Sequence, residues 1–269
     1  MTSLMWRFLD LDKIDGFYSA ALFESIGRHV GSGRVPETLL FWRVRSPVVY
    51  LGYHQCVEDE VHADFCKAHN IGIVRRILGG GCGFCDEEQI LYSVIGKEDG
   101  VIPRDIQDGY RKVLAGVVNG LEILGADGEI EPVRNAVYSG GRKISGNAQG
   151  RFDGAVMVNG SLLLDFDFEL MDKVLKNPVK NLLLVEKARD GMITLKDILT
   201  IDIESVKKAL RTGFEKALGI SMEEGKLTGS EIELSYRFMQ KYLQHDWIYK
   251  MDIKRELRKK SSAPLLQRS

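Results

Sequence analysis

The sequence has little net charge, few cysteines and no long apolar run. Thirty-seven Lys and Arg residues balance 38 Asp and Glu residues, so the formal net charge of −1 provides no overall field for nucleic acid. Four cysteines in 269 residues are too few for a disulfide scaffold, so we expect a reducing, cytoplasmic setting. No stretch approaches the roughly 20 apolar residues that span a bilayer, and no signal-peptide pattern opens the chain. The composition predicts a globular protein that binds neither nucleic acid nor membrane.

The common nucleotide-binding motifs are also absent. The sequence has no G-x-x-x-x-G-K-[ST] run, and the glycine triplet Gly79–Gly81 is not spaced as G-x-G-x-x-G. Arg75 and Arg76 precede this triplet, and short apolar segments at 71–74 and 90–95 flank it as predicted strands. Consecutive glycines let backbone N–H groups approach a ligand, and arginines bind phosphate or carboxylate. We interpret this stretch as an anion-binding loop, with a flexible surface turn as the alternative.

Helical and strand patterns alternate without the regular rhythm of a parallel sheet, which predicts an α+β fold. The predicted helices cover 14–29 (with Asp15 as N-cap), 58–69, 104–124, 205–218 and 228–242, the last opened by a capping box. The predicted strands cover 38–45, 48–51, 71–74, 90–95 and 155–165, with one more starting at Arg142. We expect one catalytic domain over 1–250, with 203–250 as its C-terminal helical part, and a flexible basic tail over 251–269.

A second informative stretch begins at Gly140-Gly141, a predicted hairpin turn that leads into the strand from Arg142. The period of two along a strand points Lys143 and Ser145 to one face and Ile144 to the other. A lysine at the start of a strand is usually exposed to solvent. On this pattern alone, Lys143 would have no special role.

Three motifs together resemble the lipoate-protein ligase A and octanoyl transferase family. The stretch at 75–86 resembles R-R-x-x-G-G-G-x-x-x-H-D, the stretch at 141–148 resembles G-x-K-I-S-G-x-A, and the stretch at 159–162 resembles the H-G-[ST]-[LI] part of a third motif. They occur in the family's order and approximate spacing. The resemblance implies the biotin/lipoate protein ligase catalytic domain fold, with mixed or antiparallel sheets flanked by helices.

The resemblance also implies an activity and its site residues. It implies activation of lipoate with ATP and Mg²⁺ to an acyl-adenylate, then transfer of the lipoyl group to a lysine of a lipoyl-carrier domain similar to glycine-cleavage H protein. Lys143 is the implied catalytic residue, because its ammonium suits charge on phosphate and acyl oxygens. The implied substrate- and nucleotide-binding residues are Glu24, Arg75, Arg76, Gly79, Gly80, Gly81, Asp86, Gln89, Ser145, Gly146, Ala148, Asn159, Gly160 and Ser161. No resident metal site is predicted.

The positions of the cysteines decide between the ligases and the transferases of this family. The transferases use a cysteine nucleophile at one of two places, and here these places hold Asn177-Pro178-Val179 and Ala136-Val137. The absence of a cysteine at both places favours the ATP-dependent ligase. However, Cys85 replaces the family's His before Asp86, and it could act as a relocated nucleophile in an ATP-independent octanoyl or lipoyl transferase.

Other departures leave further alternatives open. Asn159 replaces the His of the family's H-G pair, which permits a non-catalytic lipoate-binding relative. The C-x-x-C of Cys82 and Cys85 could form a redox pair or bind metal, but we interpret both as small residues of the glycine loop. Glu24 lies at the edge of an apolar helical stripe, a pattern typical of a solvated or ion-paired residue, whereas the resemblance places an acid there near the acyl-adenylate.

Overall fold

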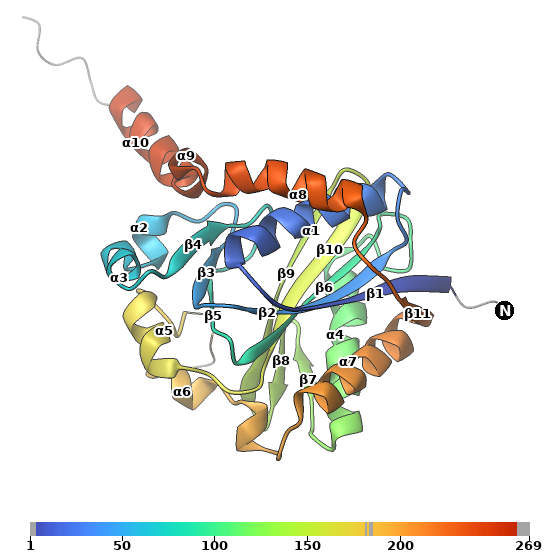
Figure 1. Cartoon of the computed structure of the whole chain (residues 1–269). Helices are drawn as coiled ribbons and strands as arrows, with labels where there is room; N and C mark the ends of the chain where they lie inside the picture. Colours follow the sequence, from blue (N-terminus) through green and yellow to red (C-terminus); the bar gives the residue numbers. More distant parts are fainter. Residues whose placement is uncertain (1–3, 181, 183–184, 263–269) are drawn as a thin grey trace, which may run out of the picture.

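Two β-sheets form the centre of the molecule. The computed structural model describes residues 4–180, 182 and 185–262 (Figure 1). The larger sheet has the strand order β11-β1-β2-β6-β10-β9-β8-β7. Its strands are β1 (Leu4–Ile14), β2 (Thr38–Val44), β6 (Gln89–Lys97), β7 (Glu129–Glu131), β8 (Ala136–Ser139), β9 (Arg142–Phe152), β10 (Ala155–Leu163) and β11 (Ile220–Glu224). The smaller sheet has the order β4-β3-β5, with β3 (Val48–Leu51), β4 (Gly72–Arg75) and β5 (Gly83–Cys85).

The strand directions are mixed. Strand β1 runs parallel to β2 and β11, and β3 runs parallel to β4, whereas the pairs from β2 through β6, β10, β9 and β8 to β7 are antiparallel. Most residues of β2 and β6 are buried, as expected for central strands covered on both faces. The predicted α+β class with mixed sheets flanked by helices is confirmed.

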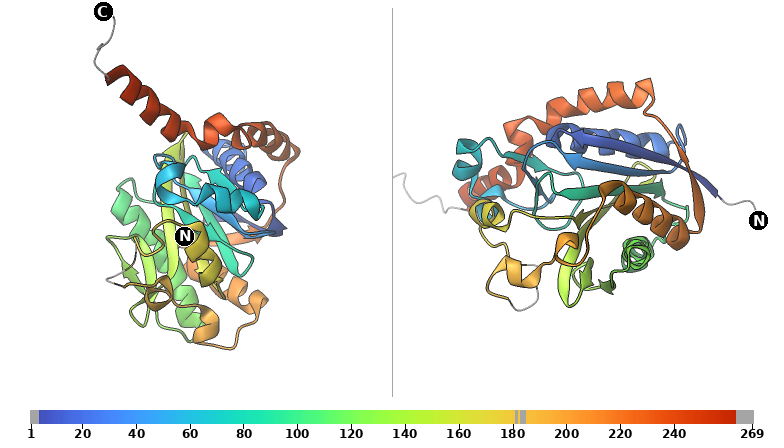
Figure 2. Two further views of the ribbon diagram at one scale, coloured as in Figure 1. Left: turned by 90° about the vertical axis from the view of Figure 1, so that its left-hand side faces the viewer. Right: turned by 60° about the horizontal axis from the view of Figure 1, so that its bottom comes forward.

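Helices cover both faces of the larger sheet, with α1 and α8 on one face and α4 and α7 on the other (Figures 1 and 2). The helices are α1 (Gly16–Gly31), α2 (Val57–Glu60), α3 (Ala63–Ala68), α4 (Ile106–Leu124), α5 (Phe168–Val174), α6 (Ala188–Gly191), the 3-10 turn η1 (Leu195–Asp197), α7 (Ile203–Leu218), α8 (Gly229–Tyr242), α9 (His245–Ile248) and α10 (Lys250–Ser262). The predicted apolar face of α4 packs against Phe214 of α7 and Phe41 of β2 in one core cluster. Within the described chain, no helix has the length and apolar character needed to cross a membrane.

Local signals in the sequence place several helix ends. The Asp15 carboxylate accepts hydrogen bonds from the N–H groups of Phe17 and Tyr18, so Asp15 is the N-cap of α1 as predicted. At α8, Thr228 and Glu231 form the predicted capping box. These caps depend only on neighbours in sequence, which is why the sequence could predict them.

The predicted helix over 58–69 is wrong in its continuity, because it is broken into α2 and α3. Val61 adopts an extended conformation between them and forms an antiparallel bridge with Leu175. The N–H of His62 then donates to the carbonyl of Val174 at 2.9 Å. A strand-like contact with a segment more than one hundred residues away therefore overrides the local helical pattern.

The predicted flexible tail over 251–269 differs in its first part, because residues up to 262 form helix α10, which extends away from the body (Figures 1 and 2). The Asp252 carboxylate accepts hydrogen bonds at 3.0 Å from the N–H groups of Val57 and Glu58 at the start of α2. Arg255 pairs with Asp59 at 2.8 Å. These contacts hold the base of α10 against α2. The rest of the predicted tail, 263–269, lies outside the described residues.

Candidate active site

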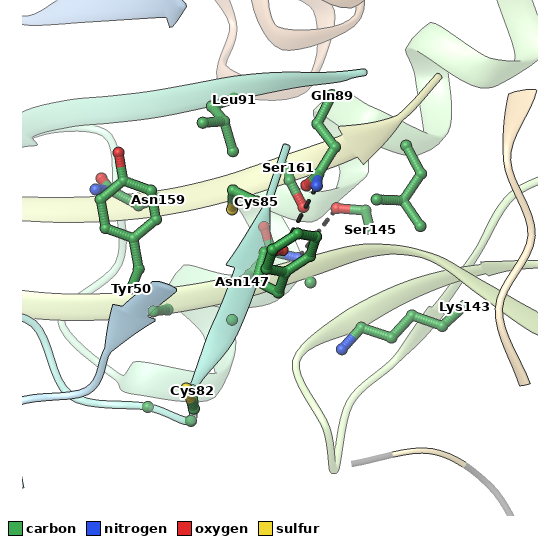
Figure 3. Close-up of a pocket in the computed structure, with 18 of the residues that line it drawn as sticks. Tyr50, Cys82, Cys85, Gln89, Leu91, Lys143, Ser145, Asn147, Asn159 and Ser161 are labelled. Carbon is green, nitrogen blue, oxygen red and sulfur yellow. Dashed lines mark hydrogen bonds between the residues drawn. The ribbon is translucent and has the colours of Figure 1, made fainter. Parts of the chain in front are cut away.

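A cavity of about 360 Å³ lies where the smaller sheet, the glycine loop and strands β9 and β10 meet (Figure 3). One end is apolar and packs into the core beneath α1. The segment that follows β10 forms a second apolar wall. Residues of the first wall are Phe23, Trp42, Tyr50, Cys85 and Leu91, and residues of the second are Leu163, Phe166, Met171, Leu175, Leu182 and Met192. A cavity of this kind suits a ligand with an apolar chain.

The glycine loop joins β4 to β5 along one side of this cavity. One nitrogen of the Arg76 guanidinium, Nη2, donates to the carbonyls of Gly79 and Gly81 at 3.2 and 2.8 Å. Between them, Gly80 has φ +89°, a conformation that favours glycine. A Cβ at Gly80 would lie 3.2 Å from the Cβ of Ala148, so the loop sits directly on β9. The motif alanine is small because the loop crosses it at this point.

Lys143 lies near the start of β9 with its side chain in the cavity, as does Ser145, whereas Ile144 is buried in the core on the opposite face. The side chains therefore alternate as the sequence predicted. A Cβ on Gly146 would lie 3.0 Å from both Cε and Nζ of Lys143, so the amine folds back over its own strand. Figure 3 shows Lys143 extending toward the side of the cavity that carries Cys82.

The environment of Lys143 disfavours its charged form. Burial, together with the nearby positive charge of Arg134, lowers the pKa of the Lys143 amine to about 8. The described residues that line the cavity include Arg76 and Arg134 but no Asp or Glu. The cavity is therefore positive and offers no carboxylate to neutralise Lys143. Such a perturbed amine in a cleft is typical of a functional site.

Polar residues of β9 and β10 line the same cavity, and buried hydroxyls of β6 bond to them. The Tyr92 hydroxyl donates to Asn147 and lies 3.4 Å from the Ser145 hydroxyl. Any side chain at Gly160 would overlap Tyr92 and Asn147, so this glycine makes room for the pair. Ser93 donates to the side-chain oxygen of Asn159 at 2.6 Å, which fixes the orientation of that amide.

Two free cysteines line the cavity. Burial raises the pKa of the Cys82 and Cys85 thiols to about 12 each, and the adjacent Asp86 contributes to the rise at Cys85. Both are therefore protonated thiols at neutral pH, and either would need a base to act as a nucleophile. Among the residues that the structure describes, no group of three or more His, Cys, Asp and Glu is arranged to hold a metal ion.

Most residues that the sequence analysis assigned to the ligand come together here. They are Arg76, Gly80, Gly81, Cys85, Gln89, Lys143, Ser145, Gly146, Ala148, Asn159, Gly160 and Ser161. They come from the glycine loop and four different strands. The structure thus brings the three motifs of the sequence to one cavity.

Four assigned residues do not line the cavity: Glu24, Arg75, Gly79 and Asp86. Glu24 is buried beneath α8, where it accepts hydrogen bonds from Arg28 and the Tyr242 hydroxyl at 3.0 and 2.8 Å and pairs with Lys241. Its helical pattern indicated a solvated or an ion-paired residue, and the structure shows the buried, ion-paired one.

Arg75 and Asp86 bind backbone groups of the protein. The fully buried Arg75 guanidinium donates to five carbonyls, those of Gly52, Tyr53, Gln55, Trp247 and Ile248. Asp86 accepts from the N–H groups of Glu88 and Asp167 at 3.0 and 2.9 Å. Asp86 therefore orders the chain after β5, and Arg75 joins the loop after β3 to the C-terminal helices.

The sequence analysis did not identify several residues that line the cavity. Arg134 and Asn135 lie in a loop without a motif, and the second apolar wall comes from a segment whose composition carries no functional signal. Asn147 was detectable in principle, because it lies between Gly146 and Ala148 of the motif at 141–148, although the motif itself does not specify this residue. For the others, only their place in the fold shows that they face the cavity.

Comparison with known proteins connects this site to lipoylation enzymes. Residues 15–215 match the lipoyl protein ligase A/B catalytic domain model. The chain is 30% identical over 278 residues to octanoyltransferase LipM of Geobacillus kaustophilus, covering 93% of this chain and 100% of that protein. A lipoate-protein ligase A bound with ATP has a similar fold, with TM-score 0.80, 29% identity and coverage of 92% and 99% of the two chains. A bipartite lipoate protein ligase of Thermoplasma acidophilum, described with its E2 lipoyl domain, has TM-score 0.81 and 28% identity, with coverage of 92% of this chain and 97% of that chain.

These comparisons correct the predicted reaction and confirm the predicted family. The prediction of an ATP-dependent lipoate ligase is wrong, because the curated relatives, including the one above, carry the name octanoyltransferase LipM. A transferase moves an acyl group that is already bound to a carrier, so the predicted ATP, Mg²⁺ and acyl-adenylate are overturned with it. The fold is shared by ligases and transferases and does not decide between them. By its matching domain and its relatives, the chain belongs to the lipoyl protein ligase A/B catalytic domain family.

Proposed function

We propose that this protein transfers an octanoyl group from a thioester donor to a lysine of a lipoyl-carrier domain, without ATP. The observation that carries the proposal is that the Cys85 thiol and the Lys143 amine line one cavity with apolar walls. An eight-carbon chain matches the apolar end, a thiol can accept the acyl group, and an amine with a pKa of about 8 can act as a base near neutral pH. The names of the curated relatives support the same reaction.

In the first step, the sulfur of Cys85 attacks the carbonyl carbon of the donor thioester. Lys143 in its neutral form takes the thiol proton as the new C–S bond forms, because burial disfavours a free thiolate at Cys85. The carbonyl π electrons move to oxygen and return when the donor C–S bond breaks. The donor thiolate then takes the proton from Lys143 and leaves as a thiol. The acyl group remains on Cys85 as a thioester.

In the second step, the amine of the acceptor lysine attacks the acyl-Cys85 carbonyl. The C–N bond of an amide forms, and the bond to the Cys85 sulfur breaks. Lys143 removes a proton from the attacking nitrogen and returns it to the sulfur. Because an amide is more stable than a thioester, the second step drives the transfer forward.

The remaining cavity residues have roles that follow from their positions. The apolar residues beneath α1 hold the acyl chain, and Gln89, Ser145, Asn159 and Ser161 border the reacting group. Gly146 and Gly160 leave room for Lys143 and for the Tyr92–Asn147 pair, and Ala148 supports the glycine loop. Arg75, Glu24 and Asp86 maintain the surrounding structure through the contacts described above.

The acceptor in this proposal is a small lipoyl domain. A structural neighbour is described together with its E2 lipoyl domain, which supports an acceptor of this class. The sequence resemblance favours an H-protein-like domain within the same class.

The test is an ATP-free transfer assay. The purified protein is incubated with an octanoylated acyl-carrier protein and a lipoyl domain, and the lipoyl domain is then analysed by mass spectrometry. We expect the domain to gain one octanoyl group on its lysine, and we expect an octanoyl group on Cys85 when the acceptor is omitted. Failure of both products with a competent donor and acceptor would refute the proposal.

A further inference from the structure

The carbonyl oxygens of Gly79, Gly80 and Gly81 each contact another group of the protein. Those of Gly79 and Gly81 accept from Nη2 of Arg76. The carbonyl of Gly80 lies against Gly52, where any added Cβ would overlap it. One side of the loop is therefore held by Arg76 and by the end of β3.

The amide N–H groups of the same loop have no such partners. No acceptor among the described residues bonds to the N–H groups of Gly80, Gly81 or Cys82. All three residues line the same cavity as Cys85. Successive amides next to a residue with φ +89° form a concave group of donors that favours negative charge. The charge expected here is the oxygen that becomes negative when a thiol attacks a thioester.

The state of Arg76 indicates how it acts. Its Nη2 is used by the loop, its Nε is buried without a hydrogen-bond partner, and burial lowers the pKa of the guanidinium. Arg76 bonds the glycine turn although its own hydrogen bonding stays incomplete. Without such bonds, a turn of three glycines would not keep one conformation. The arginine thus restrains the loop.

We propose that Arg76 is a positioning residue that holds the loop with its amides facing the reacting carbonyl, so that Gly80, Gly81 and Cys82 form an oxyanion hole. This inference rests on the proposed acyl transfer, because an oxyanion forms only if a carbonyl is attacked in the cavity. It differs from the role expected from sequence, in which Arg76 itself bound a phosphate. The two N–H bonds of one planar guanidinium nitrogen match two carbonyls two residues apart, and lysine lacks this rigid geometry.

The experiment compares two ligands with the same chain. Octanal accepts a thiol or water at its carbonyl and becomes tetrahedral, whereas octanol binds only through its chain and hydroxyl. Affinities of both are measured for the wild type, Arg76→Lys and Arg76→Ala, together with kcat and KM for octanoyl transfer. The matched control is Arg151→Ala, because Nη2 of Arg151 likewise donates to two carbonyls, those of Pro103 and Arg104, but lies outside the cavity.

We expect the wild type and Arg151→Ala to prefer octanal over octanol, and both Arg76 variants to lose this preference while still binding octanol. We expect kcat to fall about 10²-fold in the Arg76 variants with little change in KM. Full preference in Arg76→Lys, loss of octanol binding together with octanal, or no preference in the wild type would each overturn the inference. A wild type that prefers octanal but transfers no octanoyl group would refute the proposed function while the oxyanion hole stands.

Discussion

Buried charges are treated differently in two regions of this molecule. Where the C-terminal helices pack on the body, each buried charge has several partners: Arg75 binds five carbonyls and Glu24 binds three side chains. In the cavity, Lys143 has no carboxylate beside it among the described residues, and Nε of Arg76 has no partner. The fully bonded charges of the first region join segments of the fold, whereas Lys143 and Arg76 keep bonding capacity free beside the cavity that we propose as the substrate site.

The largest effect should come from the cavity thiols. Cys85→Ser should lower octanoyl transfer about 10³-fold or more, because the weakly acidic hydroxyl is a poor acyl acceptor. Cys82→Ser is the matched control and should change transfer less than tenfold, since it makes the same change at the second thiol that lines the cavity. Initial rates with saturating donor provide the measurement. The reverse ranking would move the nucleophile to Cys82.

Where the C-terminal helices pack on the body, Arg75→Met should lower stability without changing the catalysed reaction. We expect a loss of about 3–5 kcal/mol in the free energy of unfolding, because five buried carbonyls lose their donor. Urea denaturation measures this loss. The KM of the folded fraction should stay close to that of the wild type. A large rise in KM without loss of stability would place Arg75 in substrate binding and break the comparison.

Lys143→Met should have opposite effects on activity and stability. Transfer should fall about 10²–10³-fold, because the base is removed. Stability at pH 7 should rise by about 3 kcal/mol, because a pKa lowered from 10.5 to about 8 makes the charged form of Lys143 that much less favourable in the folded protein than in the unfolded chain. The unfolded chain binds more protons between these two values, so wild-type stability should rise with pH across this window and converge on that of the variant. Thermal unfolding of both proteins from pH 7 to 10 tests this prediction. It would be contradicted if the stability of the wild type and of the variant fell in parallel as the pH rises.

The smallest effect is the pH dependence of the wild-type rate. The neutral fraction of an amine with a pKa of about 8 rises from about a tenth at pH 7 to a half at pH 8, so the rate should rise about fivefold over this interval. The wild-type kcat measured at saturating donor should show a single ascending limb. The Lys143→Met variant should lack it. A limb that persists in this variant would belong to another group.

The sequence predicted the features that depend on near neighbours. The N-cap Asp15, the capping box at Thr228 and the alternation of Lys143 with Ile144 all follow from residues within a few positions of each other. The motifs at 75–86 and 141–148 similarly predicted the family. They did not predict the reaction, because ligases and transferases share these backbone features and differ in the chemistry that a few side chains perform.

Contacts between distant segments decided the rest. The amino-acid sequence by itself determined the helical and strand periods, the caps, and the glycines and lysine of the motifs, because these depend on local backbone geometry. Only the tertiary structure broke the helix at Val61 against Leu175, anchored α10 through Asp252, and gave the two adjacent arginines different tasks. Arg75 and Arg76 are the same residue type. Arg75 ends β4, and Arg76 directly after it still donates its N–H to Leu51 of β3, so the two side chains point to opposite faces as in a strand. Arg75 therefore contacts the C-terminal helices, and Arg76 contacts the glycine loop.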